Sequence, residues 1–229
     1  MLALFPEGFE EVEAEDAVVL AVYTDAAGEE RLRRLFPDAA GADVPDEWHD
    51  RWRAFHRGAV VGALWVGPPW ETPPSGPTAV VVDPGRAFGT GAHATTRLCL
   101  ELLQHVSRGS LADVGCGSGV LAIAAAKLGF GPVFALDVDP DAVAATEENA
   151  RRNRVELEVR LADALAGPLP ESDLSVANIT GEAVPWLPFR SALAITSGYL
   201  TGEEIALPGY RREERRELEG WAADLFRRN

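Results

Sequence analysis

The chain has 229 residues, of which 47% are hydrophobic and 25% are charged, as in folded globular proteins and unlike disordered or collagen-like chains. A chain of this length buries roughly 70% of its unfolded surface, so it needs neither disulfides nor a metal to fold. Its two cysteines, Cys99 and Cys116, lack zinc-ligand spacing and indicate a reducing compartment. We find no leader pattern at the N-terminus and no apolar run of membrane-spanning length, and therefore expect a cytoplasmic protein.

The charge balance is strongly acidic. Thirty-six acidic residues against 21 basic ones give a net charge of −15, and residues 1–50 alone carry fourteen acids and three bases. Such a chain repels a phosphate backbone, which argues against nucleic acid as a direct partner and favours a basic one. The alternative is that the excess acid serves only solubility.

The N-terminal third of the chain predicts two segments. An alternating stretch at 9–15, an apolar run at 17–24 and a helical pattern at 31–36 predict a small β-β-α appendage over residues 1–43. Residues 44–78 form a linker in this interpretation: a helix, then a connector rich in proline and glycine. Trp48, Trp52 and Phe55 share one face of that helix, which is either a packing face or a substrate groove.

From residue 79 to the C-terminus, short buried-strand patterns alternate with helical ones. This alternation predicts an α/β domain with a doubly wound, mostly parallel sheet. We expect strands at 79–82, 111–115, 133–137, 157–161, 174–178 and 193–196, and helices at 93–105, 120–128 and 140–153, with a short helix after Gly181. The tail predicts an antiparallel hairpin that turns at Glu219 and Gly220.

A glycine-rich turn between a strand and an alanine-rich helix carries the first chemical signal. Gly115, Gly117 and Gly119 allow a ligand to approach the backbone at a helix N-terminus. The spacing also fits a loose dinucleotide fingerprint. Asp113 beside the turn would repel a pyrophosphate and attract a cation, and Asp137 at the end of the next strand is placed to bind both hydroxyls of a ribose. Together these charges favour S-adenosylmethionine over a nicotinamide dinucleotide.

Four segments resemble one known family. DVGCGSG (113–119) and ALDVD (135–139) are similar to the first two motifs of class I S-adenosylmethionine-dependent methyltransferases, which have a Rossmann-like fold. DPGRAFGTGAHATTRLCL (83–100) and SVANI (175–179) narrow the match to the PrmA type, the methyltransferases of the eleventh large-subunit ribosomal protein. The resemblance covers roughly residues 44–200. The family's N-terminal recognition domain is longer than the 43 residues available here, and the segment before the final hairpin is too short for the family's helix.

The resemblance also implies the site. Thr96, Gly115, Asp137 and Asn178 match its cofactor contacts, Asp113 and Gly117 follow the general class pattern, and Asp163 matches the position that meets the adenine amino group. Asn178 would also be catalytic, because its amide oxygen can orient a substrate nitrogen toward the sulfonium methyl. The alternative is a strand-end asparagine that satisfies a turn. His93 could accept the proton or, instead, hold its loop in place.

The sequence therefore predicts an enzyme that methylates a nitrogen of a basic protein, either a lysine or an α-amino group of a free ribosomal protein, with no metal and no membrane partner. A methyltransferase of another protein or of a small molecule is the first alternative. A dinucleotide-dependent oxidoreductase and a non-catalytic cofactor-binding protein are more distant ones.

Overall fold

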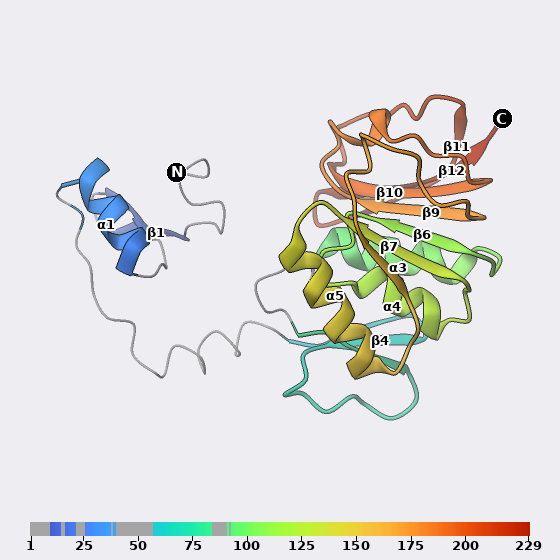
Figure 1. The fold of residues 1–229 in the computed structure, drawn as a ribbon, viewed down its shortest axis with the longest axis horizontal. Helices are drawn as coiled ribbons and strands as arrows, with labels where there is room; N and C mark the ends of the chain where they lie inside the picture. The colour runs from blue at the N-terminus through green and yellow to red at the C-terminus, as the bar shows by residue number, and fades with distance from the viewer. Residues whose placement is uncertain are drawn as a thin grey trace. The chain divides into compact units, whose positions relative to one another are not determined.

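We describe the protein from a computed structural model, which defines residues 10–14, 17–21, 26–37, 39, 57–83, 91 and 93–229 (Figure 1). The chain forms two compact units, Met1–Trp52 and Arg53–Asn229. The predicted helix with Trp48, Trp52 and Phe55 lies outside the described residues, as does most of the loop at 84–92. The three-part division at residues 43 and 78 stays a prediction.

The N-terminal unit contains the expected β-β-α order. Strand β1 (Glu10–Ala14) pairs antiparallel with β2 (Ala17–Ala21), and helix α1 (Ala26–Leu35) follows. Arg33 and Arg34 each bind a glutamate one turn earlier, at 2.8 and 2.6 Å. Exposed pairs of this spacing stabilise a helix by only about 0.3–0.5 kcal/mol each.

A three-stranded sheet opens the second unit, and the sequence did not predict it. Strands β3 (Ala59–Val61) and β4 (Leu64–Gly67) form an antiparallel hairpin inside the expected connector, and β5 (Thr78–Val81) pairs parallel with β4. We had placed β5 in the main sheet, which was wrong. Asn153, at the end of a helix, binds both backbone polar groups of Val81, at 2.9 and 2.6 Å. The free edge of β5 is therefore closed by a side chain and not by another strand.

The main sheet has seven strands in the order β11-β12-β10-β9-β6-β7-β8. Its parallel part consists of β6 (Leu111–Val114), β7 (Val133–Asp137), β8 (Glu158–Leu161), β9 (Leu174–Asn178) and β10 (Leu193–Leu200). Strands β11 (Tyr210–Leu218) and β12 (Trp221–Arg228) add the predicted antiparallel hairpin. Its turn residues Glu219 and Gly220 both have positive φ, as a two-residue hairpin turn requires.

Two hydrophobic cores cover the two faces of this sheet. Helices α3 (Ala94–His105), α4 (Val120–Lys127) and α5 (Pro140–Asn153) contribute to the first core. The second core contains Val184, Leu187 and Phe189, from the one-turn 3-10 helix η1 (Val184–Trp186) and the segment after it. Alternation along the strands divides the cores, as with Ile195 in the first and Ala194 in the second. This layered α/β architecture confirms the predicted fold class.

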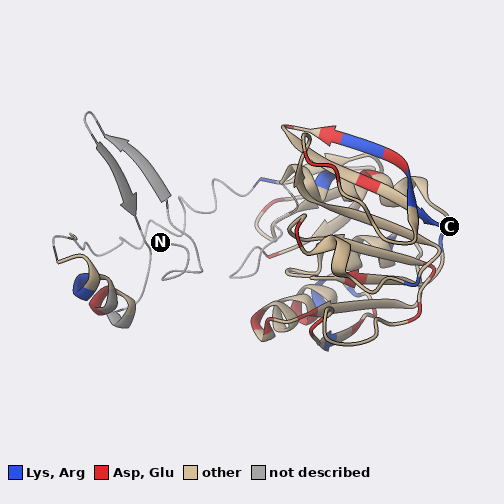
Figure 2. Cartoon of the chain, turned by 90° about the horizontal axis from the view of Figure 1, so that it is seen from above, with Lys and Arg blue, Asp and Glu red and all other residues tan. Residues whose placement is uncertain are grey.

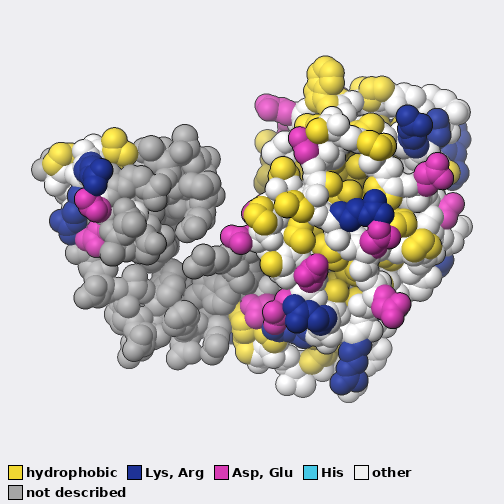
Figure 3. All heavy atoms as spheres, in the orientation of Figure 1, with side chains coloured by type: hydrophobic (Ala, Val, Ile, Leu, Met, Phe, Trp, Pro, Cys, Tyr) yellow, Lys and Arg dark blue, Asp and Glu magenta, His cyan; other side chains and the backbone are white. Residues whose placement is uncertain are grey.

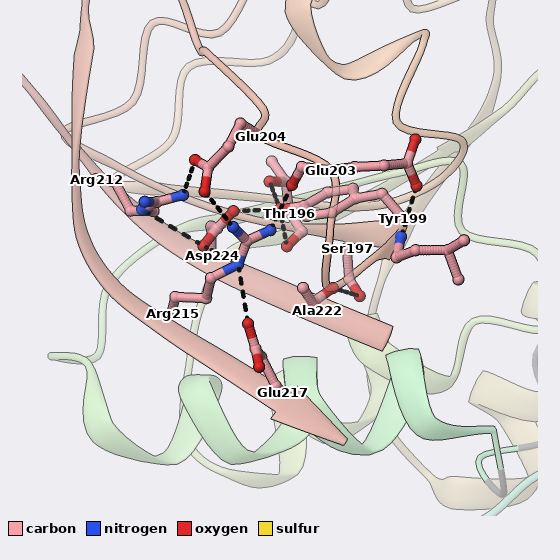
Figure 4. A network of polar contacts seen from close by, with 11 residues as sticks. Thr196, Ser197, Tyr199, Glu203, Glu204, Arg212, Arg215, Glu217, Ala222 and Asp224 are labelled. Atoms are coloured by element: carbon pink, nitrogen blue, oxygen red, sulfur yellow. Dashed lines mark hydrogen bonds and ion pairs between the residues drawn. The ribbon is translucent and has the colours of Figure 1, made fainter. Parts of the chain in front are cut away.

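The antiparallel hairpin carries a dense set of charges, seen in Figure 2 as alternating blue and red blocks near the C-terminus. On its inner side Asp224 has no exposed surface. Tyr199 donates a hydrogen bond to Asp224 at 3.0 Å, and the guanidinium groups of Arg215 and Arg212 lie 3.5 and 3.9 Å from it (Figure 4). Glu204 binds the same two arginines at 3.1 and 2.7 Å. The buried carboxylate is therefore held inside a network of opposite charges.

A glycine sets the approach of β10 to its neighbours. Gly198 has φ of 104° and lies where the register between β10 and β12 shifts. A Cβ atom built on Gly198 would overlap the carbonyl oxygen of Ile179. Because the amide of Ile179 also donates to the carbonyl of Ser197 at 3.1 Å, this close approach joins the end of β9 to the bend in β10.

Candidate functional site

A cavity of about 350 Å³ lies at the carboxyl ends of β6, β7, β8 and β9, the edge at which open α/β sheets bind ligands. Six of the seven predicted site residues line it: Thr96, Gly115, Gly117, Asp137, Asp163 and Asn178. Apolar side chains, among them Val120, Leu136 and Leu187, make up much of the remaining wall. The structure therefore brings together residues that are up to 82 positions apart in the sequence.

The glycine turn forms one wall of this cavity. Gly115, Gly117 and Gly119 have φ of 75°, 54° and 81°, conformations that residues with a Cβ atom rarely adopt. Gly119 precedes the first residue of α4, so the turn leads directly into the helix N-terminus. A Cβ on Gly115 would lie 2.6 Å from the side chain of Ile179, another lining residue. Because the glycines have no side chains, a ligand in the cavity can lie directly against the backbone of this turn.

Asp137 ends β7 and faces this turn. Its Oδ2 accepts a hydrogen bond from the Gly117 amide at 2.9 Å, and its Oδ1 accepts one from the Asp139 amide at 3.0 Å. Each carboxylate oxygen has further acceptor capacity, because an ionised carboxylate offers about four acceptor positions. Two backbone donors thus fix a partly exposed carboxylate that can still accept a pair of ligand hydroxyls.

Asp163 lies on the loop after β8 and also lines the cavity. Its Oδ1 accepts a hydrogen bond from the Leu165 amide at 2.9 Å, which forms a local turn. This contact holds both Asp163 and Leu165 at the wall of the cavity. The contact of Asp163 with an adenine amino group stays a prediction.

Asn178, at the end of β9, is oriented by two threonines. Its Nδ2 donates to Oγ1 of Thr95 at 3.2 Å and to Oγ1 of Thr96 at 3.4 Å. Oγ1 of Thr95 lies 2.8 Å from Nδ1 of His93, whose side chain caps α3 by accepting from the Thr95 amide. The resemblance assigned Thr96 to the cofactor and gave no role to Thr95. In the structure His93 is the cap, and the Thr95 hydroxyl, besides contacting Nδ1 of His93, accepts a hydrogen bond from Nδ2 of Asn178.

Asp113 is the one predicted site residue that does not line the cavity. Only 1% of its surface is exposed, and its Oδ2 accepts a hydrogen bond from the Ala122 amide in α4 at 3.0 Å. Its Oδ1 has no hydrogen-bond partner among the described residues. Burial raises the pKa of Asp113 from 3.8 to about 7. The residue thus lies behind the glycine turn, under the first turn of α4, and a contact with the ligand stays a prediction.

Cys116 lines the cavity, and the buried Thr146 of α5 lies behind it. Thr146 donates from Oγ1 to the Gly117 carbonyl at 2.9 Å and contacts Sγ of Cys116 at 3.3 Å. Burial and the nearby Asp113 raise the pKa of the Cys116 thiol to about 12, so it is no nucleophile at neutral pH. No role for Thr146 was predicted from the sequence, because a single threonine inside a helix is not part of any recognisable motif.

The charge of the cavity distinguishes between kinds of ligand. Its described lining contains two carboxylates, Asp137 and Asp163, and no lysine, arginine or histidine. Such a wall attracts an ammonium or sulfonium group and repels phosphate. From the sequence we attributed a preference for cationic ligands to Asp113. In the structure Asp137 and Asp163, which line the cavity, supply the negative charge for that preference.

The described residues contain neither a metal-binding cluster nor a membrane-spanning helix. No group of three or more histidine, cysteine, aspartate or glutamate side chains in the defined ranges could hold a metal ion. Within the same ranges, every helix is too short or too polar to cross a bilayer.

Comparison with known proteins gives a consistent match. The profile of the family described as ribosomal protein L11 methyltransferase (PrmA) matches residues 12–200. A protein of that name from Symbiobacterium thermophilum is 49% identical over 144 residues, which cover 61% of this chain and 47% of the relative. One from Pelobacter propionicus is 38% identical and covers 86% of this chain and 74% of the relative. The crystal structure of ribosomal protein L11 methylase from Lactobacillus delbrueckii subsp. bulgaricus superposes with a TM-score of 0.66 at 29% identity, over 76% of this chain and 99% of that one.

These matches extend the resemblance beyond what the motifs alone covered. The family profile begins at residue 12, inside β1, and not near residue 44. The chain spans about half the length of several curated relatives that it matches, 47%, 56% and 50% for three of them. Since the family profile covers residues 12–200 of the 229, the chain belongs to the ribosomal protein L11 methyltransferase (PrmA) family.

Proposed function

We propose that this protein is an S-adenosylmethionine-dependent methyltransferase that modifies a nitrogen of ribosomal protein L11. The convergence of the β6 glycine turn, Asp137, Asp163 and Asn178 on one cavity carries this proposal. The names of the relatives supply the substrate. The net charge of −15 favours a basic protein, and a ribosomal protein substrate favours a cytoplasmic location.

The residues present fit the proposed cofactor. Asp137 would accept hydrogen bonds from the ribose hydroxyls, the glycine turn would lie against the methionine part, and the apolar wall would cover the adenine. When bound, S-adenosylmethionine supplies a methyl group that is already activated for displacement by its sulfonium. Because no further activation of this methyl is needed, positioning by the protein can provide most of the rate acceleration.

Asn178 would position the acceptor nitrogen. Its Nδ2 is engaged by Thr95 and Thr96, so its Oδ1 is the atom left to accept a hydrogen bond from the substrate amine. A lysine must first lose a proton, which costs roughly 4–5 kcal/mol at pH 7 from a pKa near 10.4. A dry cavity lowers that cost, because burial favours the neutral amine.

Calorimetric titration tests the cofactor assignment. We expect S-adenosylhomocysteine to bind and NAD to give no signal. Asp137→Ala should lower the affinity by about 2–4 kcal/mol, because two charge-assisted hydrogen bonds are lost together. Asp141→Ala is the matched control, since this exposed aspartate lies four residues further along and does not line the cavity. Tight NAD binding would favour the dinucleotide alternative.

Mass spectrometry of recombinant L11 incubated with enzyme and S-adenosylmethionine tests the activity. We expect added methyl groups with the wild type and a turnover at least about tenfold lower with Asn178→Ala, since a positioning group is worth about 1.4 kcal/mol or more of activation free energy. A rate within about threefold of the wild type would exclude a catalytic role for Asn178. Cofactor binding without methylation of L11 would favour another protein or a small molecule as substrate.

A further inference from the structure

Exposed hydrophobic side chains are concentrated at the edge of the sheet that holds the cavity. In the space-filling view, hydrophobic side chains lie between charged ones over the visible face of the Arg53–Asn229 unit (Figure 3). Eight large hydrophobic residues are exposed among the described ones, and five of them lie at the carboxyl ends of β8 and β10 or in the loops that follow β7, β8 and β9. These five are Val138, Leu161, Leu165, Trp186 and Leu200. Grouping of this kind marks an interaction site more often than single exposed residues do.

Trp186 is the most exposed of the five, at 77%. It ends the single turn of η1, and its amide donates to the Ala183 carbonyl at 3.0 Å. Side chains three positions apart in a 3-10 turn lie one above the other, so Trp186 lies on the same side of the turn as Ala183, which lines the cavity. The flanking Val184 and Leu187 are buried and anchor the turn. A large indole is thus held in water next to the cavity by a fixed backbone.

Val138 and Leu165 extend this apolar surface to the mouth of the cavity. Both line the cavity while 70% and 54% of their surfaces remain exposed. The backbone of Leu165 is fixed by Asp163, and Val138 lies between Asp137 and Asp139, which are joined by a hydrogen bond. The three loops after β7, β8 and β9 therefore each present one exposed hydrophobic side chain; we call Val138, Leu165 and Trp186 the apolar rim.

The stretches of these loops around the rim residues carry charges of a single sign, and the first positive charge in the loop after β9 is Arg190. Residues 137–141, 161–166, 178–187 and 200–204 contain no lysine or arginine. Their acidic residues are Asp137, Asp139, Asp141, Asp163, Glu182, Glu203 and Glu204. Glu204 is engaged by Arg212 and Arg215 and is set aside. The remaining carboxylates make the surroundings of the apolar rim complementary to a positively charged partner.

We propose that the apolar rim is the docking surface for a basic polypeptide segment in which a hydrophobic side chain lies next to the acceptor amine. The hydrophobic side chain packs on Trp186, and the surrounding carboxylates attract the positive charges. This inference rests on the proposed function, because it describes how the polypeptide substrate of the same cavity is recognised. It makes Trp186 a specificity-determining residue, whose indole also suits contact with a cationic side chain.

Equilibrium binding of three short labelled peptides to the full chain tests the docking surface without requiring catalysis. In these peptides lysine alternates with leucine, lysine alternates with serine, or glutamate alternates with leucine. We expect the lysine–leucine peptide to bind at least about tenfold more tightly than the other two, and Trp186→Ala to remove that preference. Val60→Ala is the matched control, because Val60 is 54% exposed on β3, away from the carboxyl ends of the main sheet. Equal binding of the three peptides to the wild type would overturn the proposal.

Steady-state methylation of L11 provides the second measurement. Trp186→Ala should raise KM for L11 about tenfold, with kcat and the affinity for S-adenosylhomocysteine within about twofold of the wild type. An unchanged KM would overturn the docking proposal and leave the proposed function intact. Absence of wild-type activity on L11 would instead count against the proposed substrate, and the peptide titration would then decide on the docking surface. A wild type that is dimeric while Trp186→Ala is monomeric would assign the rim to self-association and overturn the proposal.

Discussion

Two buried aspartates lie on opposite faces of the main sheet and are treated differently by their surroundings. Asp224 in β12 is enclosed by Tyr199, Arg215 and Arg212. Asp113 in β6 faces the helices with one hydrogen bond, from the Ala122 amide, and no hydrogen-bond partner for its Oδ1 among the described residues. Burial raises the pKa of both carboxyls, but at Asp224 the tyrosine and the two arginines oppose the rise.

The comparison indicates that Asp224 has a structural role, whereas the protonation of Asp113 depends on its environment near the cavity. At the hairpin, Tyr199 and the two arginines oppose the rise in the pKa of Asp224, and their contacts with it link β10, β11 and β12. Oδ1 of both carboxylates lacks a hydrogen-bond partner among the described residues, but only Asp224 has arginines beside it; Asp113, two residues before Gly115, has no ion pair among them. We therefore expect changes in the hairpin to alter stability and changes near the cavity to alter proton or ligand binding.

The largest expected effect comes from removing the hairpin carboxylate. Asp224→Ala should lower the free energy of unfolding by about 3–5 kcal/mol, because the buried Tyr199 hydroxyl and the half-buried Arg215 both lose the carboxylate that they contact. Urea denaturation measures this loss, and calorimetry should show an unchanged affinity for S-adenosylhomocysteine in the variant that remains folded. A loss below about 1 kcal/mol would mean that Glu204 alone satisfies the arginines, as at an exposed ion pair.

The substitution Asp113→Asn should raise the free energy of unfolding, and the size of this increase should depend on pH. Because folding raises the pKa of Asp113, the protonated form contributes stability that is complete below pH 3.8 and is lost as the pH rises through about 7. Asparagine mimics the protonated acid and can still accept from the Ala122 amide. We expect the variant to be more stable than the wild type by roughly 2–4 kcal/mol near pH 8 and equally stable near pH 4.

The matched control for this measurement is Asp224→Asn, which should be less stable than the wild type near pH 8 because the arginines lose a charged partner. Urea denaturation of the three proteins at both pH values gives the comparison. If Asp113→Asn followed the pH dependence of the wild type, the burial of an ionisable Asp113 would not be the source of that dependence.

The smallest expected effects come from two buried threonines, one beside the cavity and one at the hairpin. Thr95 is 2% exposed and holds Asn178, whereas Thr196 is fully buried and shares a hydrogen bond of 2.8 Å with Tyr199. Thr95→Val should lower kcat for methyl transfer about tenfold, or roughly 1.4 kcal/mol, by freeing the Asn178 amide to rotate. Thr196→Val should leave kcat unchanged and lower the unfolding free energy by about 1 kcal/mol. Equal effects of both variants on kcat would remove the positioning role of Thr95.

Local signals explain which parts of the fold the sequence predicted correctly. Asp139 caps α5 and Pro140 begins it, and these bounds were confirmed because capping depends on residues next to each other in the chain. The partner of a strand is not a local property. The pattern at 79–82 indicated a strand, but its pairing with β4 depends on a hairpin at 59–67 that is too short to show a period.

The site followed the same division. The motif at 113–119 predicted the glycine turn, the end of the next strand predicted Asp137, and the family resemblance implied Asn178; all three line the cavity. Two features of the site could not be predicted from the sequence, because they depend on how the helices pack on the sheet. They are the direction of the Asp113 side chain and the hydrogen bond between Asn178 and Thr95. Trp186 was missed because nothing in its neighbourhood distinguishes an exposed tryptophan from a buried one.

The close approach at Gly198 has a consequence for how this protein can vary. The smallest possible side chain at this position would displace the Ile179 carbonyl, and Ile179 is the residue next to Asn178. A single methyl group there would therefore move the end of β9 that holds Asn178 without touching the cavity directly. In a library that contains every point variant, position 198 should behave like an active-site position, with no tolerated replacement, although glycine offers no chemistry of its own.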